Sequence, residues 1–352
     1  MLISIGILAW NEEANIAVTL ESLFRQDALL GCAESTRGCR WEVIVVPNGC
    51  SDQTAAVSRR VLQQLTAGSA VQISARVEEL AEAGKSNAWN RYVHELSDPA
   101  AELIVMLDAD IEFVQAQTLS NTIQVLLSEP GALAAVDLPL KDAWKKRRRT
   151  LVERLSIAGS QQAMAGPAAL SGQFFSARAR ILRQIWMPKG MSVEDGYLNA
   201  MIRTECMLSK EDAGRILRAP GASHYYETLT HLKSIFRHEL RLVMGTALNC
   251  YLLWDFLLFA TDPTGPGAGV LLRNLLDKDP HWYERFVANA VQVRGWWVLP
   301  RGMLFRRFAG LSKRSRGWVP GMALACVGFM LDLPIFLVAN RRLKKGRSIG
   351  FW

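Results

Sequence analysis

Short apolar runs alternate with longer segments of helical periodicity through the first part of the chain. Four of these runs have the length and the β-branched content of strands: LISIGIL (2–8), WEVIVVP (41–47), VQISARV (71–77) and ELIVML (102–107). Segments such as NEEANIAVTLESLFRQ and KSNAWNRYVHEL separate them and repeat apolar residues at the spacing of a helix. This alternation predicts an α/β fold, in which a mostly parallel sheet carries helices on both faces.

Polar motifs directly follow three of the predicted strands. AWNEE follows the first strand, PNGCSD follows the second, and the aspartates of LDAD, Asp108 and Asp110, follow the fourth. Ligands of a mostly parallel sheet lie beyond the carboxyl ends of its strands. We therefore expect the three motifs to meet at one edge of the sheet and form a binding site. The alternative is a solvated turn, since an Asp-x-Asp pair also arises by chance.

The sequence contains no glycine-rich phosphate loop. The first strand is followed by AWNEEAN, which lacks the GxGxxG fingerprint of dinucleotide-binding enzymes, and a P-loop is absent as well. A bound nucleotide would therefore be held by side chains and a metal ion. Two aspartates supply the hard oxygen ligands that suit Mg²⁺ or Mn²⁺.

The charge of the chain favours anionic partners. The net charge is +8 and the isoelectric point about 9.3, over 352 residues of which 50% are hydrophobic. Nucleic acid, acidic lipid head groups and phosphorylated small molecules all fit this charge. The six cysteines show no CxxC spacing and are interpreted as reduced thiols, with a Cys32–Cys39 bridge as the alternative. The start of the chain is interpreted as a strand, because it lacks the positively charged segment of a signal peptide.

The composition changes in the second part of the chain. Segments rich in Trp, Leu and Phe, with arginines between them, predict a helical, membrane-interfacial region over 229–352, after an α/β domain over 1–228. One apolar run, residues 318–340, has the length of a membrane span and is followed by RRLKKGR. Asp332 and Pro334 interrupt this run, so an interfacial or re-entrant helix fits as well. A buried helix of a soluble region is the third alternative.

Five motifs, taken in order, resemble those of a known enzyme family. ILAWNEEANI resembles a P-x-Y-N-E segment, VVPNGCSDQT a V-D-D-G-S-x-D-x-T segment and AGKSNAWNRY an x-G-K-x-x-A-x-N segment. VMLDAD resembles the DxD motif and SVEDGYL the downstream E-D motif of inverting family 2 glycosyltransferases with a GT-A fold. The resemblance covers residues 1 to about 230. It implies a mixed, mostly parallel sheet. It also implies a metal-dependent, inverting transferase that uses a nucleotide-diphosphate sugar together with Mg²⁺ or Mn²⁺.

The resemblance also implies which residues hold the donor. The base and ribose would contact the residues after the first strand, which are Ala9, Trp10, Asn11 and Glu12. Asn48 stands where the family usually has an aspartate that contacts the base, so the identity of the base stays open. Asn48-Gly49 is also typical of an ordinary turn. Lys85 would lie near the diphosphate, with a solvated lysine as the alternative.

The metal ion and the acceptor are assigned in the same way. Asp110 would ligate the metal, Asp108 would bind the ribose or the metal, and His224 would be a further metal or phosphate ligand or else a structural histidine. The general base would be Asp195, with Glu194, although this pair also suits the first turn of a helix. Other residues expected at the acceptor or diphosphate are Gly172, Gln173, Arg237 and Arg241. The last two replace a Q/R-x-x-R-W motif that is incomplete here.

These features favour transfer of a single sugar to a hydroxyl acceptor, either lipid-linked or saccharide, in envelope or exopolysaccharide synthesis. The partners would include a membrane surface but no nucleic acid, and the location would be cytoplasmic, peripheral or monotopic at the inner face of the membrane. A basic cluster over 144–155 would contact anionic lipid or form a solvated face. The alternative function is a catalytically inactive sugar-nucleotide-binding protein or membrane scaffold. Nucleotidyltransferases and haloacid-dehalogenase phosphatases require motifs that this chain lacks.

Overall fold

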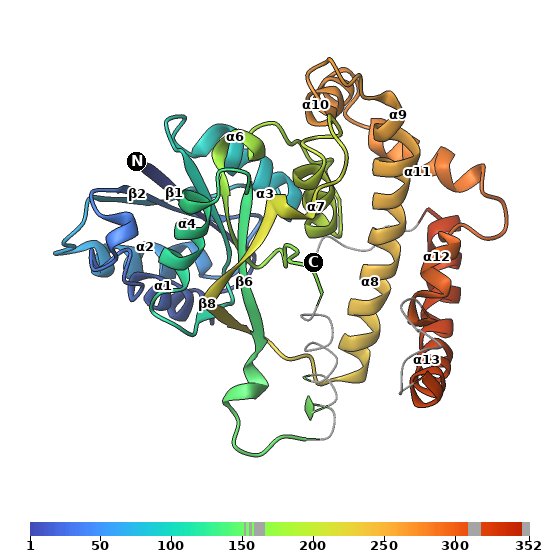
Figure 1. The fold of residues 1–352 in the computed structure, drawn as a ribbon, viewed down its shortest axis with the longest axis horizontal. Helices are drawn as coiled ribbons and strands as arrows, with labels where there is room; N and C mark the ends of the chain where they lie inside the picture. Colours follow the sequence, from blue (N-terminus) through green and yellow to red (C-terminus); the bar gives the residue numbers. More distant parts are fainter. Residues whose placement is uncertain (151–152, 155–156, 158–165, 309–317, 347–352) are drawn as a thin grey trace.

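A computed structural model of the chain describes residues 1–150, 153–154, 157, 166–308 and 318–346 (Figure 1). Its centre is an eight-stranded sheet with the order β3-β2-β1-β4-β7-β6-β8-β5. In chain order the strands are β1 (Leu2–Ala9), β2 (Arg40–Pro47), β3 (Ile73–Val77), β4 (Leu103–Asp108), β5 (Glu112–Phe113), β6 (Ala134–Lys141), β7 (Phe174–Arg178) and β8 (Ile216–Tyr226).

Half of the sheet is parallel and half is mixed. β1 pairs in parallel with β2 and β4, and β2 pairs in parallel with β3, as the alternation of strands and helices predicts. β7 is antiparallel to both β4 and β6, whereas β6 and β8 are parallel. The short strand β5 runs antiparallel to β8. The predicted mixed and mostly parallel sheet is therefore confirmed.

Helices cover both faces of the sheet because its central strands are apolar on both sides. In β2, Val43 and Val45 belong to one core, whereas Ile44 and Val46 belong to the other. α1, α2 and α4 pack on the first core, and α3 and α7 on the second. The helices of this part are α1 (Ile16–Phe24), α2 (Thr54–Thr66), α3 (Lys85–Arg91), α4 (Thr118–Ser128), α6 (Ala179–Leu182) and α7 (Glu194–Arg203). Short helical turns lie at η1 (Glu34–Thr36), η2 (Tyr92–Leu96), η3 (Asp142–Lys145) and η4 (Ala213–Arg215).

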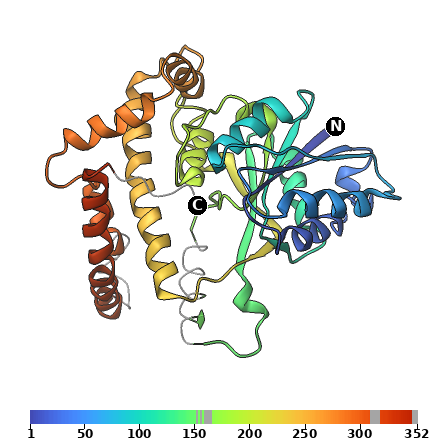
Figure 2. The ribbon, with the colours of Figure 1, turned by 180° about the vertical axis from the view of Figure 1, so that it is seen from behind.

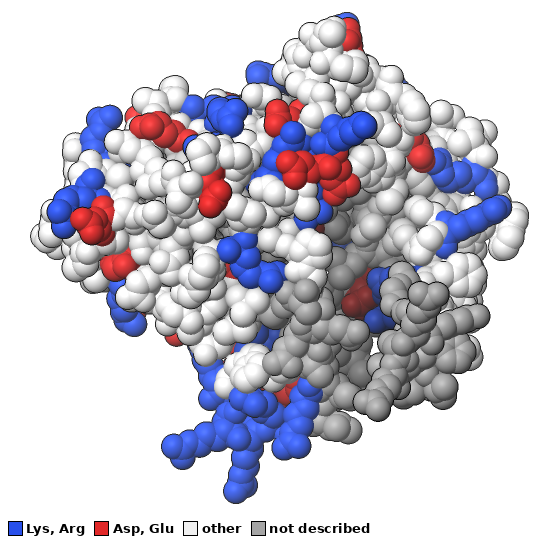
Figure 3. Space-filling view, viewed as in Figure 1, with Lys and Arg blue, Asp and Glu red and all other residues white. Residues whose placement is uncertain are grey.

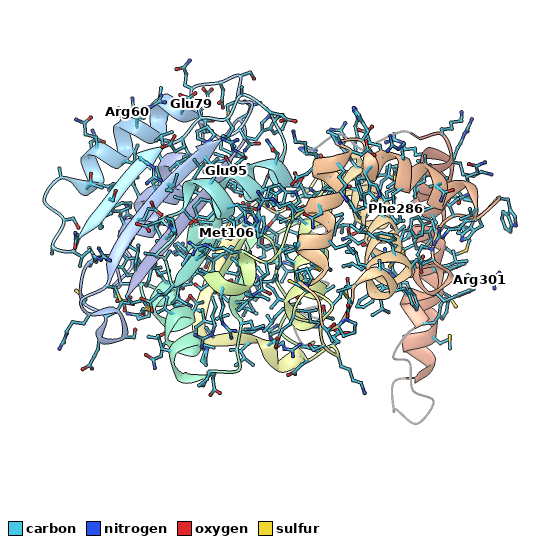
Figure 4. The ribbon with its side chains drawn as sticks, turned by 90° about the horizontal axis from the view of Figure 1, so that it is seen from above. Arg60, Glu79, Glu95, Met106, Phe286 and Arg301 are labelled. Carbon is cyan, nitrogen blue, oxygen red and sulfur yellow. The ribbon has the colours of Figure 1, made fainter. Side chains whose placement is uncertain are left out.

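The described residues from Leu232 to Lys344 form helices beside the sheet (Figure 2). These are α8 (Leu232–Cys250), η5 (Tyr251–Leu257), α9 (Leu258–Ala260), α10 (Ala268–Lys278), α11 (Trp282–Gln292), α12 (Arg301–Leu304), η6 (Arg306–Phe308) and α13 (Trp318–Lys344). Seen from above, Phe286 of α11 lies among these helices, and Met106 of β4 lies within the sheet part (Figure 4). That residues 229–352 form a domain of their own stays a prediction.

α8 joins the two parts of the molecule. The Asn249 side chain donates a hydrogen bond to the carbonyl of Val193, with an Nδ2–O distance of 2.7 Å. Gly245 lies so close to Val193 that an added Cβ would be 2.3 Å from its side chain. On its other side α8 packs against α13, as both views of the ribbon show. α8 is therefore covered by protein on two sides.

The apolar run over 318–340 lies within one helix, α13, which continues through Pro334. Asp332 is only 3% exposed and is hydrogen-bonded by Arg306 and Arg307 of η6. By length and composition two helical segments could cross a membrane, Leu232–Ala260 and Gly321–Lys344. Half of the apolar window of the first is buried within the protein, against 24% for the second.

Candidate active site

The three predicted motifs meet at one edge of the sheet. Ala9, the last residue of β1, is paired with Pro47 of β2, and Leu8 is paired with Asp108 of β4. The three strands therefore end side by side, and the polar residues that follow them lie at the same edge.

A single lysine links two of the predicted site carboxylates. Lys85 is the first residue of α3, and its ammonium lies 2.6 Å from Asp108 Oδ1 and 3.1 Å from Glu194 Oε1. The ammonium also donates to the carbonyl of Gly172 at 3.2 Å. These three contacts account for the three donors of the ammonium group. Lys85 is therefore occupied by protein acceptors and fixes α3, β4 and α7 relative to one another.

The pKa values of Asp108 and Lys85 are shifted by burial and by the pairing of one ammonium with two carboxylates. Burial raises the pKa of Asp108 to about 7, against the opposing effect of Lys85 and with a further increase from Asp110. For Lys85, burial alone would lower the pKa, but Asp108 and Glu194 raise it above its ordinary value. One ammonium thus serves two carboxylates in a site with little solvent.

Asp195 lies next to this group without an ion-pair partner among the described residues. It occupies the first turn of α7, where its Oδ1 accepts a hydrogen bond from the amide of Gly196 at 2.8 Å. A Cβ on Gly172 would lie 3.3 Å from the Cβ of Asp195. Burial raises the pKa of Asp195, and the negative charge of Glu194 raises it further, while Gly196, Lys85 and Arg241 oppose the increase. A carboxylate of this kind is suited to accept a proton.

The loops after β1 and β2 are tied to each other. Asn11, which has a φ of 54°, accepts a hydrogen bond from the Ser51 amide at 2.8 Å. Glu13 accepts from the amide of Gln53 at 2.8 Å, and its own amide donates to Asp52. These bonds shape the rim before any ligand binds, which lowers the entropy cost of binding. β1 ends at this rim with Ala9, and Trp10 follows it before Asn11.

Asn48 is fully buried and its amide is bonded to the main chain. Nδ2 donates to the carbonyl of Ala9 at 2.8 Å, and Oδ1 accepts from the amide of Gly84 at 3.0 Å. Asn48 thus connects the ends of β1 and β2 to the residue before α3. Because Asn48 is fully buried, a base could contact its amide only if neighbouring residues moved, and that role stays a prediction.

The predicted metal residues are spread along the rim. Asp110 is exposed on the turn between β4 and β5, and it contributes to the raised pKa of Glu12, for which burial is the main cause. Among the described residues, no group of three or more His, Cys, Asp or Glu side chains is arranged to hold a metal ion. The donor set at Asp110 therefore fits a cation that takes water and ligand phosphate oxygens for most of its coordination, as Mg²⁺ does.

His224 is fully buried on β8 rather than open to the rim. Its Nδ1 lies 2.7 Å from Asp137 Oδ2, and its Nε2 lies 3.2 Å from Gln173 Oε1. A carboxylate at Nδ1 fixes the ring, as it does behind many metal-bound histidines. The Gln173 oxygen at Nε2 is an acceptor, so in this orientation it does not favour a free electron pair on Nε2. Metal binding by His224 would require Gln173 to move, and it stays a prediction. The main-chain carbonyl of Gln173 also accepts from the Asp108 amide at 2.8 Å.

The predicted arginines lie on α8 and differ in exposure. Arg237 is exposed, whereas Arg241 is partly buried and lowers the pKa of Asp195. Burial lowers the pKa of the neighbouring His238, and the charges of Arg241 and Lys141 lower it further. Arg241 thus acts on both Asp195 and His238, whereas Lys141 at the end of β6 acts on His238.

Two features of the site were missed from the sequence. Asp137, the partner of His224, interrupts the apolar segment ALAAVDL in the way that Asp108 interrupts LIVMLDADIEF, and this signal could have drawn attention to it. The ion pair between Lys85 and Glu194 joins residues far apart in the chain, so no local spacing indicates it.

All six cysteines are free thiols, and the alternative of a Cys32–Cys39 bridge is therefore wrong.

Comparison with known proteins agrees with this architecture. The mannosyltransferase PcManGT from Pyrobaculum calidifontis, solved in complex with GDP-Man and Mn²⁺, is 16% identical, and the match covers 97% of this chain and 86% of that chain with a TM-score of 0.54. Glucosyl-3-phosphoglycerate synthase from Mycobacterium tuberculosis, solved with Mn²⁺, UDP and phosphoglyceric acid, is 18% identical, with coverages of 70% and 78% and a TM-score of 0.45. The first of these likenesses supports the GT-A fold.

The family follows from the sequence match. The family model described as glycosyl transferase family 2 matches residues 4–197, which is more than half of the chain. The chain belongs to glycosyl transferase family 2. The comparison with curated proteins finds no match.

Proposed function

We propose that this protein is an inverting glycosyltransferase that moves a single sugar from a nucleotide-diphosphate donor to a hydroxyl acceptor. The observation that carries the proposal is the group formed by Lys85, Asp108 and Glu194, with Asp195 beside it. Asp195 is the carboxylate of this group that has no ion-pair partner among the described residues, and its pKa is raised. It lies next to the negatively charged rim. Family membership supports the same reaction class.

In the proposed reaction Asp195 removes the proton of the acceptor hydroxyl while that oxygen attacks the anomeric carbon. The bond between the anomeric carbon and the diphosphate breaks on the opposite side, the nucleoside diphosphate leaves, and the configuration at this carbon is inverted. Burial of Asp195 raises its proton affinity, which improves it as a base near neutral pH. Lys85 acts as a positioning residue, because it holds Glu194, the residue before Asp195, against β4.

A divalent cation fits the excess of negative charge at the rim. Asp110 is the residue best placed to ligate it, because it is exposed and has no ion-pair partner among the described residues. Asp108 is already paired with Lys85, and His224 is covered by Gln173. A bound Mg²⁺ or Mn²⁺ would neutralise charge on the departing diphosphate. The solved relatives contain Mn²⁺ or Mg²⁺ together with nucleotides, which supports this assignment.

The donor and acceptor sides are proposed to lie on opposite sides of Lys85. The rim on the nucleotide side is formed by Ala9, Trp10, Asn11 and Glu12. Asn48 supports this rim through its hydrogen bond to the carbonyl of Ala9. Gly172 and Gln173 lie between the two sides, next to Asp195 and Asp108. Arg241, with Arg237 one turn earlier, faces the acceptor side. We propose a lipid-linked or saccharide acceptor and a peripheral position at the cytoplasmic face of a membrane.

A panel of UDP-, GDP- and dTDP-sugars tests the proposal. Each sugar is scored for hydrolysis and for thermal stabilisation of the protein, with and without Mn²⁺. We expect one of these donors to stabilise the protein only when the metal is present, and Asp110→Ala to remove that stabilisation. Glu112→Ala, an exposed carboxylate two residues further on that pairs with Lys145, serves as the matched control. Failure of every donor to bind, with and without metal, would contradict the proposal.

A further inference from the structure

The positive charge of the chain is concentrated in its last part. Residues 285–352 contain thirteen Lys and Arg but one acidic residue, Asp332. Residues 1–284 contain 28 basic and 32 acidic residues and are therefore slightly negative. The net charge of +8 thus comes entirely from the helices α11 to α13 and the segments around them. This part of the protein attracts anionic partners.

One face of α13 is apolar and exposed. Met330 and Leu331 are 65% and 70% exposed, and Val327 and Leu337 are 58% and 55% exposed. The exposed residues follow one another at intervals of three or four, so they form a stripe along the helix: Ala323, Val327, Met330, Pro334 and Leu337. At about 1.5 Å per residue the stripe is about 20 Å long. It contains no charged side chain and ends at Arg341.

The opposite face of α13 is held by the protein. Both oxygens of Asp332 accept hydrogen bonds from Arg307 at 2.9 Å, and Arg306 donates to one of them at 3.0 Å. Near the end of the helix, Asn340 accepts from the Val298 amide at 2.7 Å. Phe336, between these two anchors, is fully buried. Because this face is fixed at two points, the apolar stripe stays on the outside.

The position of α8 decides how lipid could reach the stripe. α8 lies between α7 and α13 in both views (Figures 1 and 2), and its Glu239 forms an ion pair with Arg306 at 3.1 Å. If α13 crossed a bilayer, α8 would enter the hydrocarbon with it, together with Glu239 and Arg241 and the adjoining α7. Charged groups at that depth are unfavourable. Lipid can therefore contact α13 only from its outer side, with the helix axis parallel to the membrane.

We propose that the outer face of α13 docks onto an anionic lipid surface, with the helix lying flat in the head-group region. Arg341 and Arg342 are exposed at the end of the stripe, and Arg301 lies at the outer edge of the helical part (Figure 4). Trp296, which is 79% exposed, follows α11 near the anchored end of α13. An apolar stripe bordered by arginines and a tryptophan is the pattern of an interfacial helix.

A second copy of the chain fits the outer face of α13 less well than an anionic lipid surface does. Two such surfaces would bring together two strongly positive regions, with Asp332 as their one acidic residue and already buried. Like charges at that distance repel, whereas anionic head groups neutralise them. The inference rests on the proposed membrane association for its partner, but not on the transfer reaction.

Cosedimentation of the full chain with vesicles tests this face directly. We expect binding to phosphatidylcholine vesicles that contain phosphatidylglycerol, weaker binding to phosphatidylcholine alone, and a decrease with added salt. Met330→Glu with Leu331→Glu should lower binding at least about tenfold, since both side chains would enter the interface. Arg341→Glu with Arg342→Glu should lower it less on mixed vesicles and have little effect without the anionic lipid.

The control for the arginine variants replaces two arginines by glutamate on a different basic surface of the protein. Arg147 and Arg148 are exposed on the loop after β6, where Lys and Arg side chains gather at the lower tip of Figure 3. Arg147→Glu with Arg148→Glu should leave vesicle binding nearly unchanged. Loss of binding in this control, or its retention in the Met330 and Leu331 double variant, would overturn the proposal. Circular dichroism and a thermal melt establish that each variant is folded.

Two further outcomes separate this inference from its rivals. A dimer in sedimentation equilibrium that the Met330 and Leu331 double variant dissociates, without vesicle binding by the wild type, would show that a second copy covers the face. Donor hydrolysis is measured in the same samples, because the substituted residues lie away from Lys85 and Asp195. Donor binding or hydrolysis without vesicle binding refutes the docking alone. Vesicle binding without binding or hydrolysis of any donor refutes the transferase alone.

Discussion

Asp108 and Asp332 both interrupt apolar runs, but Asp108 lies in a network with surplus negative charge and Asp332 in a network whose charges are balanced. Asp108 shares one cation, Lys85, with Glu194, and Asp195 lies beside them unpaired. Asp332 accepts hydrogen bonds from Arg306 and Arg307, and Glu239 is the other carboxylate of that network. The first network has more carboxylates than cations, and the second has equal numbers.

The pKa shifts of the two aspartates follow this difference. Burial raises the pKa of Asp108 to about 7, because one shared ammonium does not offset it. Burial would also raise the pKa of Asp332, but the hydrogen bonds of Arg307 and Arg306 bring it below its usual value. Surplus negative charge and a strongly raised pKa are typical of a functional site, whereas the charges of the Asp332 network are compensated within the protein.

Asp195→Asn gives the largest expected effect on activity. The amide cannot accept the proton, so turnover should fall by about a hundredfold to ten-thousandfold, while donor binding in the presence of Mn²⁺ is retained. The melting temperature should not decrease, because an uncharged amide replaces a carboxylate whose ionisation burial opposes. Initial rates, donor titration and a thermal melt measure the three quantities. Asp277→Asn, on an exposed surface of α10, is the control, and full turnover in Asp195→Asn would mean that another group is the base.

Lys85→Met removes the cation that Asp108 and Glu194 share. Asp108 and Glu194 would then face each other without compensation, and the free energy of unfolding should decrease by about 3 kcal/mol. Donor affinity should also fall, because α3, β4 and α7 are no longer held together. Urea denaturation measures the first effect and calorimetry the second. Lys189→Met breaks the exposed pair with Glu82 and should change stability by less than about 1 kcal/mol. Equal losses of stability in Lys85→Met and Lys189→Met would show that the shared cation of the site matters no more than an exposed ion pair.

Asp332→Asn tests the balanced network. Arg306 and Arg307 are 33% and 45% exposed, so water can solvate them, and the loss should be about 1–2 kcal/mol. Donor hydrolysis should remain at the wild-type rate, because the network does not touch the rim. Denaturation and hydrolysis assays are run in parallel. Asp255→Asn, at the exposed pair with Arg294, should have the smaller effect on stability. A large loss of hydrolysis in Asp332→Asn would show that the network serves catalysis.

Arg241→Gln should produce the smallest change, seen in the pH dependence. The positive charge of Arg241 lowers the pKa of Asp195, so its removal raises that pKa. The base must be deprotonated to act, and the acidic limb of kcat/KM should therefore move to higher pH, with little change above it. Arg241→Lys keeps the charge and should leave the profile in place. A shift to lower pH would contradict the assignment of Asp195 as the base.

The sequence predicts the central strands well because they are buried on both sides. β1, β2 and β4 are mostly apolar, and their observed ends lie within one residue of the predicted ones. β5 has only two residues, and β8 contains Pro220 and Gly221, so neither shows a clear period. These strands are held by pairing across the chain rather than by their own pattern.

The site shows the same limit. The rule that ligands lie beyond strand ends placed Asp108 and Asp110 at the rim correctly. It could not show that Asn48 bonds only to main chain, or that His224 is covered by Gln173 and paired with Asp137. These contacts join segments about forty to ninety residues apart, and they depend on the packed fold rather than on spacing.

The position of α8 between α7 and α13 also determines how far Asp195 lies from a membrane that touches α13. Packed helices lie about 8–10 Å apart, so two such layers and the radius of α13 put Asp195 about 20–25 Å from a surface that touches the outer side of α13. A hydroxyl at the level of the lipid head groups would be too far from this carboxylate. An acceptor presented by that membrane would therefore carry its reactive hydroxyl on a spacer a few sugar units long, and enzymatic acceptance should depend on spacer length.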